Sequence, residues 1–182
     1  MPEITQVRLS GFGGQGIVLA GILLGEAGVI DGKYVAGSNS YGAQARGSSC
    51  LSEIVFSNGP IDFPHLTTAD ILVAMSQGAY DIFCEDVKET SGLILFDPYQ
   101  ITPREGLNLM QTGIPATEYA LKRLKDKQIA NVVLLGALIA ITKIVSVKAT
   151  QKTIRTRVGE GFRSLNLKAL EIGIELGGRV HG

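Results

Sequence analysis

Glycines near the N-terminus form the motif with the clearest chemical meaning. Gly11, Gly13 and Gly16 satisfy G-x-G-x-x-G within the stretch LSGFGGQGIVLA, residues 9–20. The apolar residues before the motif predict a strand, and those after it predict a helix. Glycines let a backbone turn tightly and approach a pyrophosphate, whose charge is favoured by the amides and dipole of a helix N-terminus. The motif therefore indicates a phosphate-bearing ligand, with tight packing of helix against strand as the purely structural alternative.

The residues that follow narrow the kind of nucleotide. A dinucleotide dehydrogenase carries Asp or Glu at the end of its second strand, about 20 residues further on, to bind the ribose hydroxyls. The predicted strand 33–36 runs into residues 37–40, which contain no acid, and Asp31 falls in the turn before that strand. NAD is therefore disfavoured. No Gly-Lys-Ser/Thr follows the glycines, so a P-loop for ATP hydrolysis is excluded.

A polar loop, predicted over residues 37–47, is the second candidate. It contains Tyr41 and Arg46, flanked by glycines. The carboxyl ends of parallel strands share one edge of a sheet, so this loop is expected to start beside the glycine motif. Arg46 or Tyr41 would then approach the same anion. The structural alternative is a solvated surface loop.

Short apolar runs alternate with helical patterns, which predicts parallel strands joined by crossover helices. Strands are predicted over residues 6–10, 33–36, 49–56, 69–75, 92–96 and 107–112, with 60–63 as a hairpin partner of 49–56. Helices are predicted over 17–30, from 77, from 115, and over 131–145, 149–158 and 165–176, where Gly177-Gly178 would end the last one. We expect a single α/β domain over residues 1–182, with three layers, a mostly parallel sheet and a helical C-terminal third.

Composition excludes several classes of partner. Lysine plus arginine equals aspartate plus glutamate at 17 each, so no basic excess exists to attract nucleic acid or anionic lipid. The apolar stretch 132–141 is shorter than the roughly 20 residues that span a bilayer, which excludes a membrane role. The N-terminus lacks the pattern of a signal peptide. A cytoplasmic protein is expected.

The metal-binding and nucleophilic residue types are sparse. Cys50 and Cys84 are far apart and form no CxxC, so neither a disulfide framework nor an iron–sulfur or zinc site is predicted. His65 and His181 have no other ligand type at metal spacing, so no metal site is expected. The carboxylates show no pairing typical of acid–base catalysis, and no catalytic residue is assigned.

Four motifs, in order and spacing, resemble the gamma subunit of 2-oxoacid:ferredoxin oxidoreductases. They are GFGGQG (11–16), SYGAQARG (40–47), IDFP (61–64) and ADILVAMSQGAY (69–80), and NVVLLGA (131–137) and NLKALEIGIEL (166–176) extend the resemblance over most of the chain. The first and second motifs are more similar to the 2-oxoglutarate or ketoisovalerate members than to the pyruvate members. The polar loop departs from the family pattern, which often has Pro-Glu at Ala43-Gln44 and glycine at Ser48. No carboxylate role is therefore carried over to this loop.

The resemblance implies a place in an anaerobic oxidoreductase complex. In such enzymes a thiamine subunit decarboxylates the 2-oxoacid, iron–sulfur clusters pass electrons to ferredoxin, and coenzyme A takes the acyl group. This sequence has no Gly-Asp-Gly thiamine motif and no cluster cysteines. Thiamine diphosphate, magnesium and the clusters are therefore expected on alpha, beta and, in some assemblies, delta subunits.

The part expected of this chain is coenzyme A binding and assembly, without catalysis on its own. The resemblance implies that the glycine motif helps to hold coenzyme A beside the thiamine site. The expected cofactor-binding residues are Gly11, Gly13, Gly14, Gln15 and Gly16, with Tyr41, Arg46 and Ser48 as second contacts. A purely structural subunit and a stand-alone dinucleotide-binding protein remain as alternatives. The oxoacid, the direction of the reaction, the stoichiometry and a homodimer of the isolated chain stay open.

Overall fold

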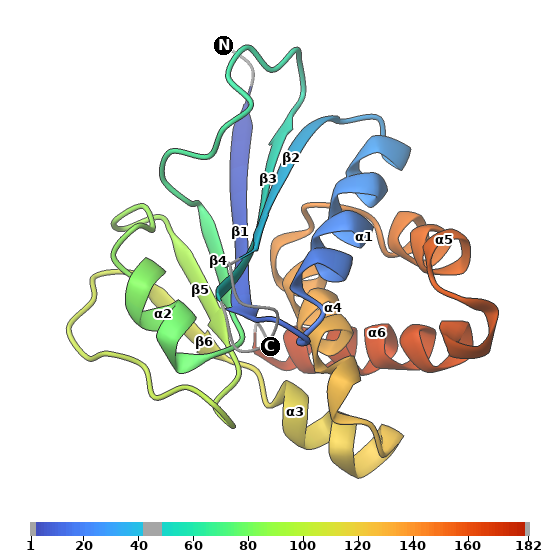
Figure 1. The fold of residues 1–182 in the computed structure, drawn as a ribbon. Helices are drawn as coiled ribbons and strands as arrows, with labels where there is room; N and C mark the ends of the chain where they lie inside the picture. Colours follow the sequence, from blue (N-terminus) through green and yellow to red (C-terminus); the bar gives the residue numbers. More distant parts are fainter. Residues whose placement is uncertain (1–2, 42–48, 181–182) are drawn as a thin grey trace.

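A six-stranded sheet organises the part of the chain that the computed structural model describes, residues 3–41 and 49–180 (Figure 1). The strand order is β2-β3-β1-β4-β5-β6. The strands are β1 (Ile4–Phe12), β2 (Tyr34–Tyr41), β3 (Ser49–Ser57), β4 (Ile71–Ala74), β5 (Leu93–Phe96) and β6 (Met110–Gly113).

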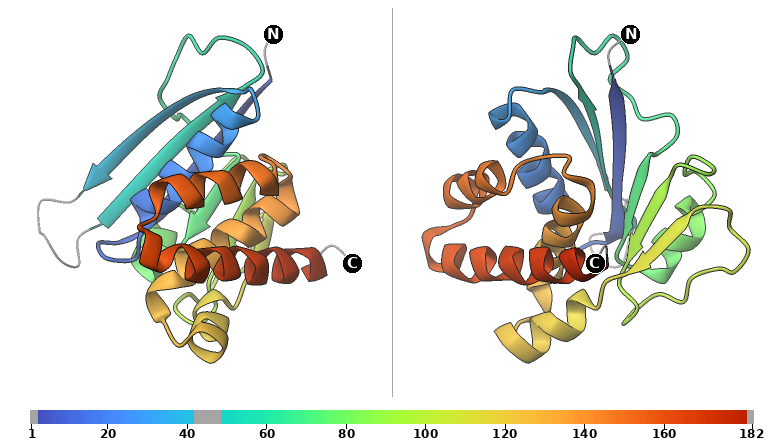
Figure 2. Two further views of the ribbon diagram at one scale, coloured as in Figure 1. Left: turned by 90° about the vertical axis from the view of Figure 1, so that its right-hand side faces the viewer. Right: turned by 180° about the vertical axis from the view of Figure 1, so that it is seen from behind.

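Helices cover both faces of this sheet. They are α1 (Ile17–Ile30), α2 (Gln77–Phe83), α3 (Ala116–Tyr119), α4 (Ala130–Thr142), α5 (Val147–Arg157) and α6 (Glu160–Val180). A π-helical turn, Ala120–Leu124, and a 3-10 turn, Lys127–Ile129, connect α3 to α4. Figures 1 and 2 show α1, α4, α5 and α6 on one side of the sheet and α2 on the other. The predicted three-layer α/β fold with a helical C-terminal third is confirmed.

Each face of the sheet has its own apolar core. The larger core joins the sheet to α1, α4, α5 and α6, and the smaller one joins it to α2. Leu24 and Leu134 are fully buried in the first core, and Tyr80 is fully buried in the second. Within residues 3–41 and 49–180, no helix has both the length and the apolar character needed to cross a membrane.

The sheet is mostly parallel, as predicted, but β3 runs against its neighbours. The pairs β1-β4, β4-β5 and β5-β6 are parallel, whereas β3 is antiparallel to both β1 and β2. Seven residues separate Tyr41 from Ser49, which is too short for the crossover of a dozen or more residues that a parallel pair needs. β3 is therefore the antiparallel member of the mostly parallel sheet.

Two strand predictions are wrong, because β3 pairs with β2 on one side and with β1 on the other. β2 continues to Tyr41, so residues 37–41 belong to a ladder with β3 and not to a loop. The polar residues 38–40 are tolerated there because β2 is an edge strand and they are exposed. The predicted hairpin of 60–63 with 49–56 is absent from the described part of the chain. Both edges of β3 are already paired, with β1 and β2.

The predicted end of the last helix is also wrong. α6 continues through Gly177-Gly178 to Val180. A Cβ on Gly173 would lie 2.9 Å from the Gly136 Cα, and one on Gly177 would lie 2.9 Å from the Ala137 Cα. These glycines let α6 lie against the backbone of α4, so they serve packing and not helix termination (Figure 2).

Candidate functional site

The glycine turn, residues 13–16, joins the carboxyl end of β1 to the start of α1. Gly14 has φ +94° and Gly16 has φ +72°, in the left-handed region that favours glycine. A Cβ built on Gly14 would have nothing within 4 Å. The sequence therefore needs glycine at Gly14 for backbone conformation, and the backbone there faces open space.

Gln15 holds this turn in place. Its Oε1 accepts a hydrogen bond from the Phe12 amide at 2.6 Å, and its Nε2 donates to the Met75 carbonyl at 2.7 Å. The same Nε2 lies 3.3 Å from Oε1 of Gln100. The side chain thus ties the turn to the end of β4 and to the segment after β5. Its amide group is engaged within the protein.

Asn131, the second residue of α4, anchors the turn from the other side. Its Nδ2 donates to the Gly16 carbonyl at 3.0 Å, and its Oδ1 accepts from the Val132 amide at 2.9 Å. A Cβ on Gly16 would collide with this amide group. Sequence analysis assigned Asn131 no role. The sequence feature that could have indicated this role is the single amide side chain in the first turn of a helix that is otherwise almost wholly apolar.

The start of α1 supplies backbone amides beside the turn. Its N-cap is Gly16, which provides no side-chain cap, and the first helical bond runs from the Ala20 amide to the Gly16 carbonyl at 3.0 Å. The preceding amides belong to residues 17–19, where the positive end of the helix dipole also lies. One of them, that of Val18, hydrogen-bonds to Cys50. This end of α1 therefore favours negative charge.

Cys50, on β3, lies close to the start of α1, and the sequence did not reveal this proximity. The residue is 6% exposed. Burial raises the pKa of the Cys50 thiol, and the hydrogen bond from the Val18 amide opposes this effect more weakly. The thiol is therefore held in its protonated form. The Cys50 backbone lies opposite Gly11 in the β1-β3 pair.

The other predicted site residues lie at different distances from the turn. Gly11 is a packing position, because a Cβ there would lie 2.9 Å from Cδ1 of Ile17 and 3.1 Å from Cβ of Met75. Gly11 and Tyr41 both pair with Cys50 of β3, so their backbones lie two strands apart, about 10 Å. The end of β2 was predicted to lie beside the turn, but β3 lies between β2 and β1. Arg46 and Ser48 lie outside the described residues.

Two cavities flank the glycine turn. One, of about 340 Å³, lies between the turn, the start of α4 and the corner where α5 meets α6. The other, of about 280 Å³, lies between the turn, the end of β4 and the start of α3. Gly14 and Gln128 contribute to both walls. The volumes lie near the lower end of the range for small-molecule pockets, about 300–1,000 Å³. The turn can therefore hold a ligand that extends beyond a phosphate.

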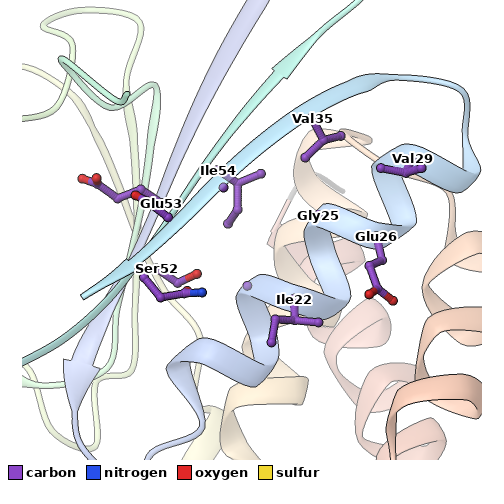
Figure 3. Close-up of a pocket in the computed structure, with 12 residues that line it drawn as sticks. Ile22, Gly25, Glu26, Val29, Val35, Ser52, Glu53 and Ile54 are labelled. Carbon is purple, nitrogen blue, oxygen red and sulfur yellow. The ribbon is translucent and has the colours of Figure 1, made fainter. Parts of the chain in front are cut away.

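A separate groove of about 280 Å³ lies between α1 and the outer strands β2 and β3 (Figure 3). Ile22, Val29 and Val35 give it apolar walls. Glu53 points to the opposite face of the sheet, where its carboxylate pairs with Arg8 at 2.8 Å. The groove does not include the glycine turn. Among residues 3–41 and 49–180, no group of three or more His, Cys, Asp and Glu side chains is placed to hold a metal ion.

The fold and the open glycine turn define an α/β domain with a Rossmann-like turn after its first strand, and comparison with known proteins specifies the family. A family model described as pyruvate ferredoxin/flavodoxin oxidoreductase matches residues 6–176. The chain belongs to this family. Within the family it is similar to gamma-type subunits of 2-oxoacid:ferredoxin oxidoreductase complexes. The resemblance read from the sequence motifs is confirmed.

The individual matches agree with this assignment. The 2-oxoglutarate synthase subunit KorC of Methanocaldococcus jannaschii is 42% identical over 174 residues, covering 94% of this chain and 92% of its own length. Subunits of ketoisovalerate oxidoreductase and pyruvate synthase match at lower identity. The keto/oxoacid ferredoxin oxidoreductase gamma subunit of Geobacter sulfurreducens superposes with a TM-score of 0.86 at 38% identity, covering 96% of this chain and 97% of that one.

A further match shows the fold alone. The 2-oxoglutarate:ferredoxin oxidoreductase of Magnetococcus marinus superposes with a TM-score of 0.86 at 22% identity, covering 96% of this chain and 31% of that one. That enzyme was solved with 2-oxoglutarate, coenzyme A and succinyl-CoA bound. The same domain architecture therefore occurs inside a much longer oxidoreductase chain.

Proposed function

We propose that this chain binds coenzyme A within a complex that oxidatively decarboxylates 2-oxoglutarate and passes electrons to ferredoxin. The observation that carries the proposal is the open backbone of Gly14 between two cavities, at the start of a helix. The turn suits a diphosphate because the free amides and the dipole at the start of α1 favour negative charge. The names of the relatives favour 2-oxoglutarate as the oxoacid and coenzyme A as the acyl acceptor.

The residues of the turn have distinct roles in this proposal. The amides of Gly13, Gly14 and Gly16 bind the diphosphate, and Gln15 keeps the turn in shape through its bonds to Phe12 and Met75. Gly11 allows the close packing that brings the turn to the sheet. Tyr41, Arg46 and Ser48 are proposed as second contacts, with the Arg46 guanidinium pairing with a phosphate.

The remaining chemistry is proposed for partner subunits. Thiamine diphosphate, magnesium and the iron–sulfur clusters are then held by alpha, beta and, where present, delta subunits. Coenzyme A supplies the thiol that takes the acyl group, so the thiol end must extend from this chain to the partner subunit that holds thiamine diphosphate. No residue of this chain is assigned to catalysis. We also propose a cytoplasmic location, because the proposed complex passes electrons to ferredoxin.

The assignment is tested by blocking the turn in the assembled complex. Gly14→Leu adds a side chain over the diphosphate position, and Gly32→Leu is a matched control. Gly32 has φ +81° with nothing within 4 Å of a Cβ, but it lies in the turn after α1. We expect Gly14→Leu to raise the KM for coenzyme A at least tenfold, with the KM for the oxoacid unchanged. Gly32→Leu should change neither constant.

Three measurements separate the proposal from the alternatives. A purely structural subunit predicts that Gly14→Leu leaves the KM for coenzyme A unchanged while the complex still assembles. A stand-alone dinucleotide-binding protein predicts saturable binding in an NADH titration of the purified chain. Anaerobic purification of the tagged chain, followed by coenzyme A-dependent dye reduction with several 2-oxoacids, identifies the companions and the substrate. Purification without companions and without activity would refute the proposal.

A further inference from the structure

The outer edge of the sheet, at β2, lacks the features that normally protect an edge strand. β2 is the first strand in the order β2-β3-β1-β4-β5-β6, so one of its edges has no neighbouring strand in the described part of the chain. Its eight residues, YVAGSNSY, pair with β3 without interruption and include neither a charged residue nor proline. Natural proteins use charges, prolines or bulges to keep other strands from pairing with such an edge. The outer backbone groups of β2 are therefore available to a further strand.

The helix beside this edge, α1, carries apolar side chains on its outer face. Residues 22, 25, 26 and 29 follow the spacing i, i+3, i+4, i+7 and therefore share one face of the helix. Ile22 is 39% exposed and Val29 is 60% exposed. The one charge on this face, Glu26, pairs with Arg157. A helix that is apolar on every side is normally buried, so this face is expected to be covered by another protein segment.

Gly25 keeps the groove between α1 and β2 open (Figure 3). A Cβ there would lie 3.6 Å from Cγ1 of Val35 and 3.9 Å from Cγ2 of Ile54, which are ordinary contact distances. Packing within this chain therefore does not require glycine at this position, although glycine inside a helix costs stability relative to alanine. Gly28, one turn further along α1, differs because a Cβ there would collide with the Phe56 ring. The space above Gly25 is thus left for a side chain from outside this chain.

The chemistry of this surface indicates the kind of partner. Free backbone donors and acceptors beside an apolar groove suit an extended strand that carries a bulky apolar side chain. Since β2 has no charge and Glu26 is already paired, the surface lacks the charged groups that steer transient encounters. Apolar surfaces are typical of permanent association. In the ketoisovalerate oxidoreductase subunit VorA of Methanothermobacter marburgensis, the matching region is 29% of a longer polypeptide, so that domain is permanently joined to further protein.

We propose that a companion subunit of the oxidoreductase complex adds a strand to the free edge of β2 and places a bulky apolar side chain in the groove between α1 and β2. This inference rests on the proposed function, which requires companion subunits. The added strand extends the six-stranded sheet and covers Ile22 and Val29. The groove does not include the glycine turn, so the companion docks here without blocking the ligand.

The test measures assembly of the complex from this chain and its co-expressed companion subunits. Val29→Glu places a charge in the apolar contact, and Gly25→Leu fills the groove. We expect each variant to raise the dissociation constant of the complex, measured by dilution, at least about tenfold. Ile82→Glu is the control, because Ile82 is 61% exposed on α2, which packs on the other face of the sheet. It should leave the dissociation constant unchanged.

Two further measurements identify the mode of contact and guard against misfolding. Gly25→Leu should raise the Tm of the isolated chain by about 2–4 °C, because leucine is a better helix former than glycine. In the unmodified complex, the backbone amides of residues 34–40 should exchange with solvent at least about tenfold more slowly than in the isolated chain. A contact through side chains alone would not slow this exchange.

Each contrary result overturns a defined part of the inference. An unchanged dissociation constant in Val29→Glu or Gly25→Leu, or an equal loss in Ile82→Glu, would overturn the docking surface and leave coenzyme A binding to be judged by Gly14→Leu. Weakened assembly without slower exchange in β2 would overturn the added strand. Slow exchange in β2 that depends on the concentration of the isolated chain would assign the edge to a second copy. An unmodified chain that assembles with no companion would overturn both this inference and the proposed function.

Discussion

Two glycine-rich regions of this molecule use the same residue for opposite purposes. In the turn at residues 13–16, Gly14 adopts a left-handed backbone conformation and faces open space. In the contact between α4 and α6, Gly136, Gly173 and Gly177 lie within helices and face the backbone of the neighbouring helix. The turn needs glycine for its φ angle, whereas the helix pair needs it for close approach. Only the turn leaves backbone amides accessible to a ligand.

The largest expected effect tests the helix pair. Gly173→Ala places a Cβ against the Val133 carbonyl and 2.9 Å from the Gly136 Cα, so the two helices must separate. We expect the free energy of unfolding in urea to fall by about 3 kcal/mol. Gly178→Ala is the control, because it lies on the same helix with nothing within 4 Å of its Cβ. It should raise stability by about 0.5 kcal/mol. Similar effects of the two variants would contradict the packing role.

A smaller effect is expected where the turn meets α4. Gly16→Ala combines a strained φ of +72° with a collision against the Asn131 side chain. We expect a loss of about 2 kcal/mol in urea unfolding. In an Asn131→Ala background the collision is absent, so the cost of Gly16→Ala should fall by at least about 0.5 kcal/mol. Additive effects would show that the two residues are not coupled.

Alkaline pH probes the two buried thiols, Cys50 opposite Gly11 in the sheet and Cys84 at the end of α2. Burial raises the pKa of Cys50 and of Cys84 in the folded protein. Both thiols stay protonated when folded but ionise in the unfolded chain above its pKa of about 8.5, so stability is complete below that pH and is lost as the pH rises. The free energy of unfolding should fall by up to about 1.4 kcal/mol per pH unit for each thiol between pH 9 and 10. Cys50→Ala should reduce this slope, and an unchanged slope would contradict the burial of that thiol.

The smallest effect separates conformational strain from ligand binding. Gly14→Ala and Gly32→Ala introduce a Cβ at similar positive φ angles, +94° and +81°, with no neighbour within 4 Å. Each should lower the free energy of unfolding by about 1 kcal/mol, because the strain is the same. Thermal unfolding of the two purified variants checks this equality. A much larger loss for Gly14→Ala would mean that the turn is packed and not open.

The local features of the fold were predictable from the sequence. The helix at Ile17–Ile30 was predicted with the correct bounds, because the glycine motif precedes it and Asp31-Gly32 follows it. The helix predicted from residue 77 starts there, and Ser76 caps it, since its Oγ accepts from the Ala79 amide at 3.3 Å. Such signals act between residues close in the sequence. The full length of β2 depended on a partner strand, and it was missed.

The surroundings of the candidate site were less predictable. Asn131 lies 115 residues from Gly16, with which it bonds, and no local pattern marks such a pair. Gly177 was interpreted as a helix end, because its neighbour on α4 was unknown.

The sequence by itself determined the glycine turn, the helix that follows it and the family to which the chain belongs, because these depend on residue types at short, fixed spacing. The tertiary structure alone decided the reversed direction of β3, the use of Gly173 and Gly177 in packing, and the side chains that surround Gly14. These features depend on contacts between distant segments and on which buried polar atoms find partners. Such properties belong to the folded chain and not to any one stretch of it.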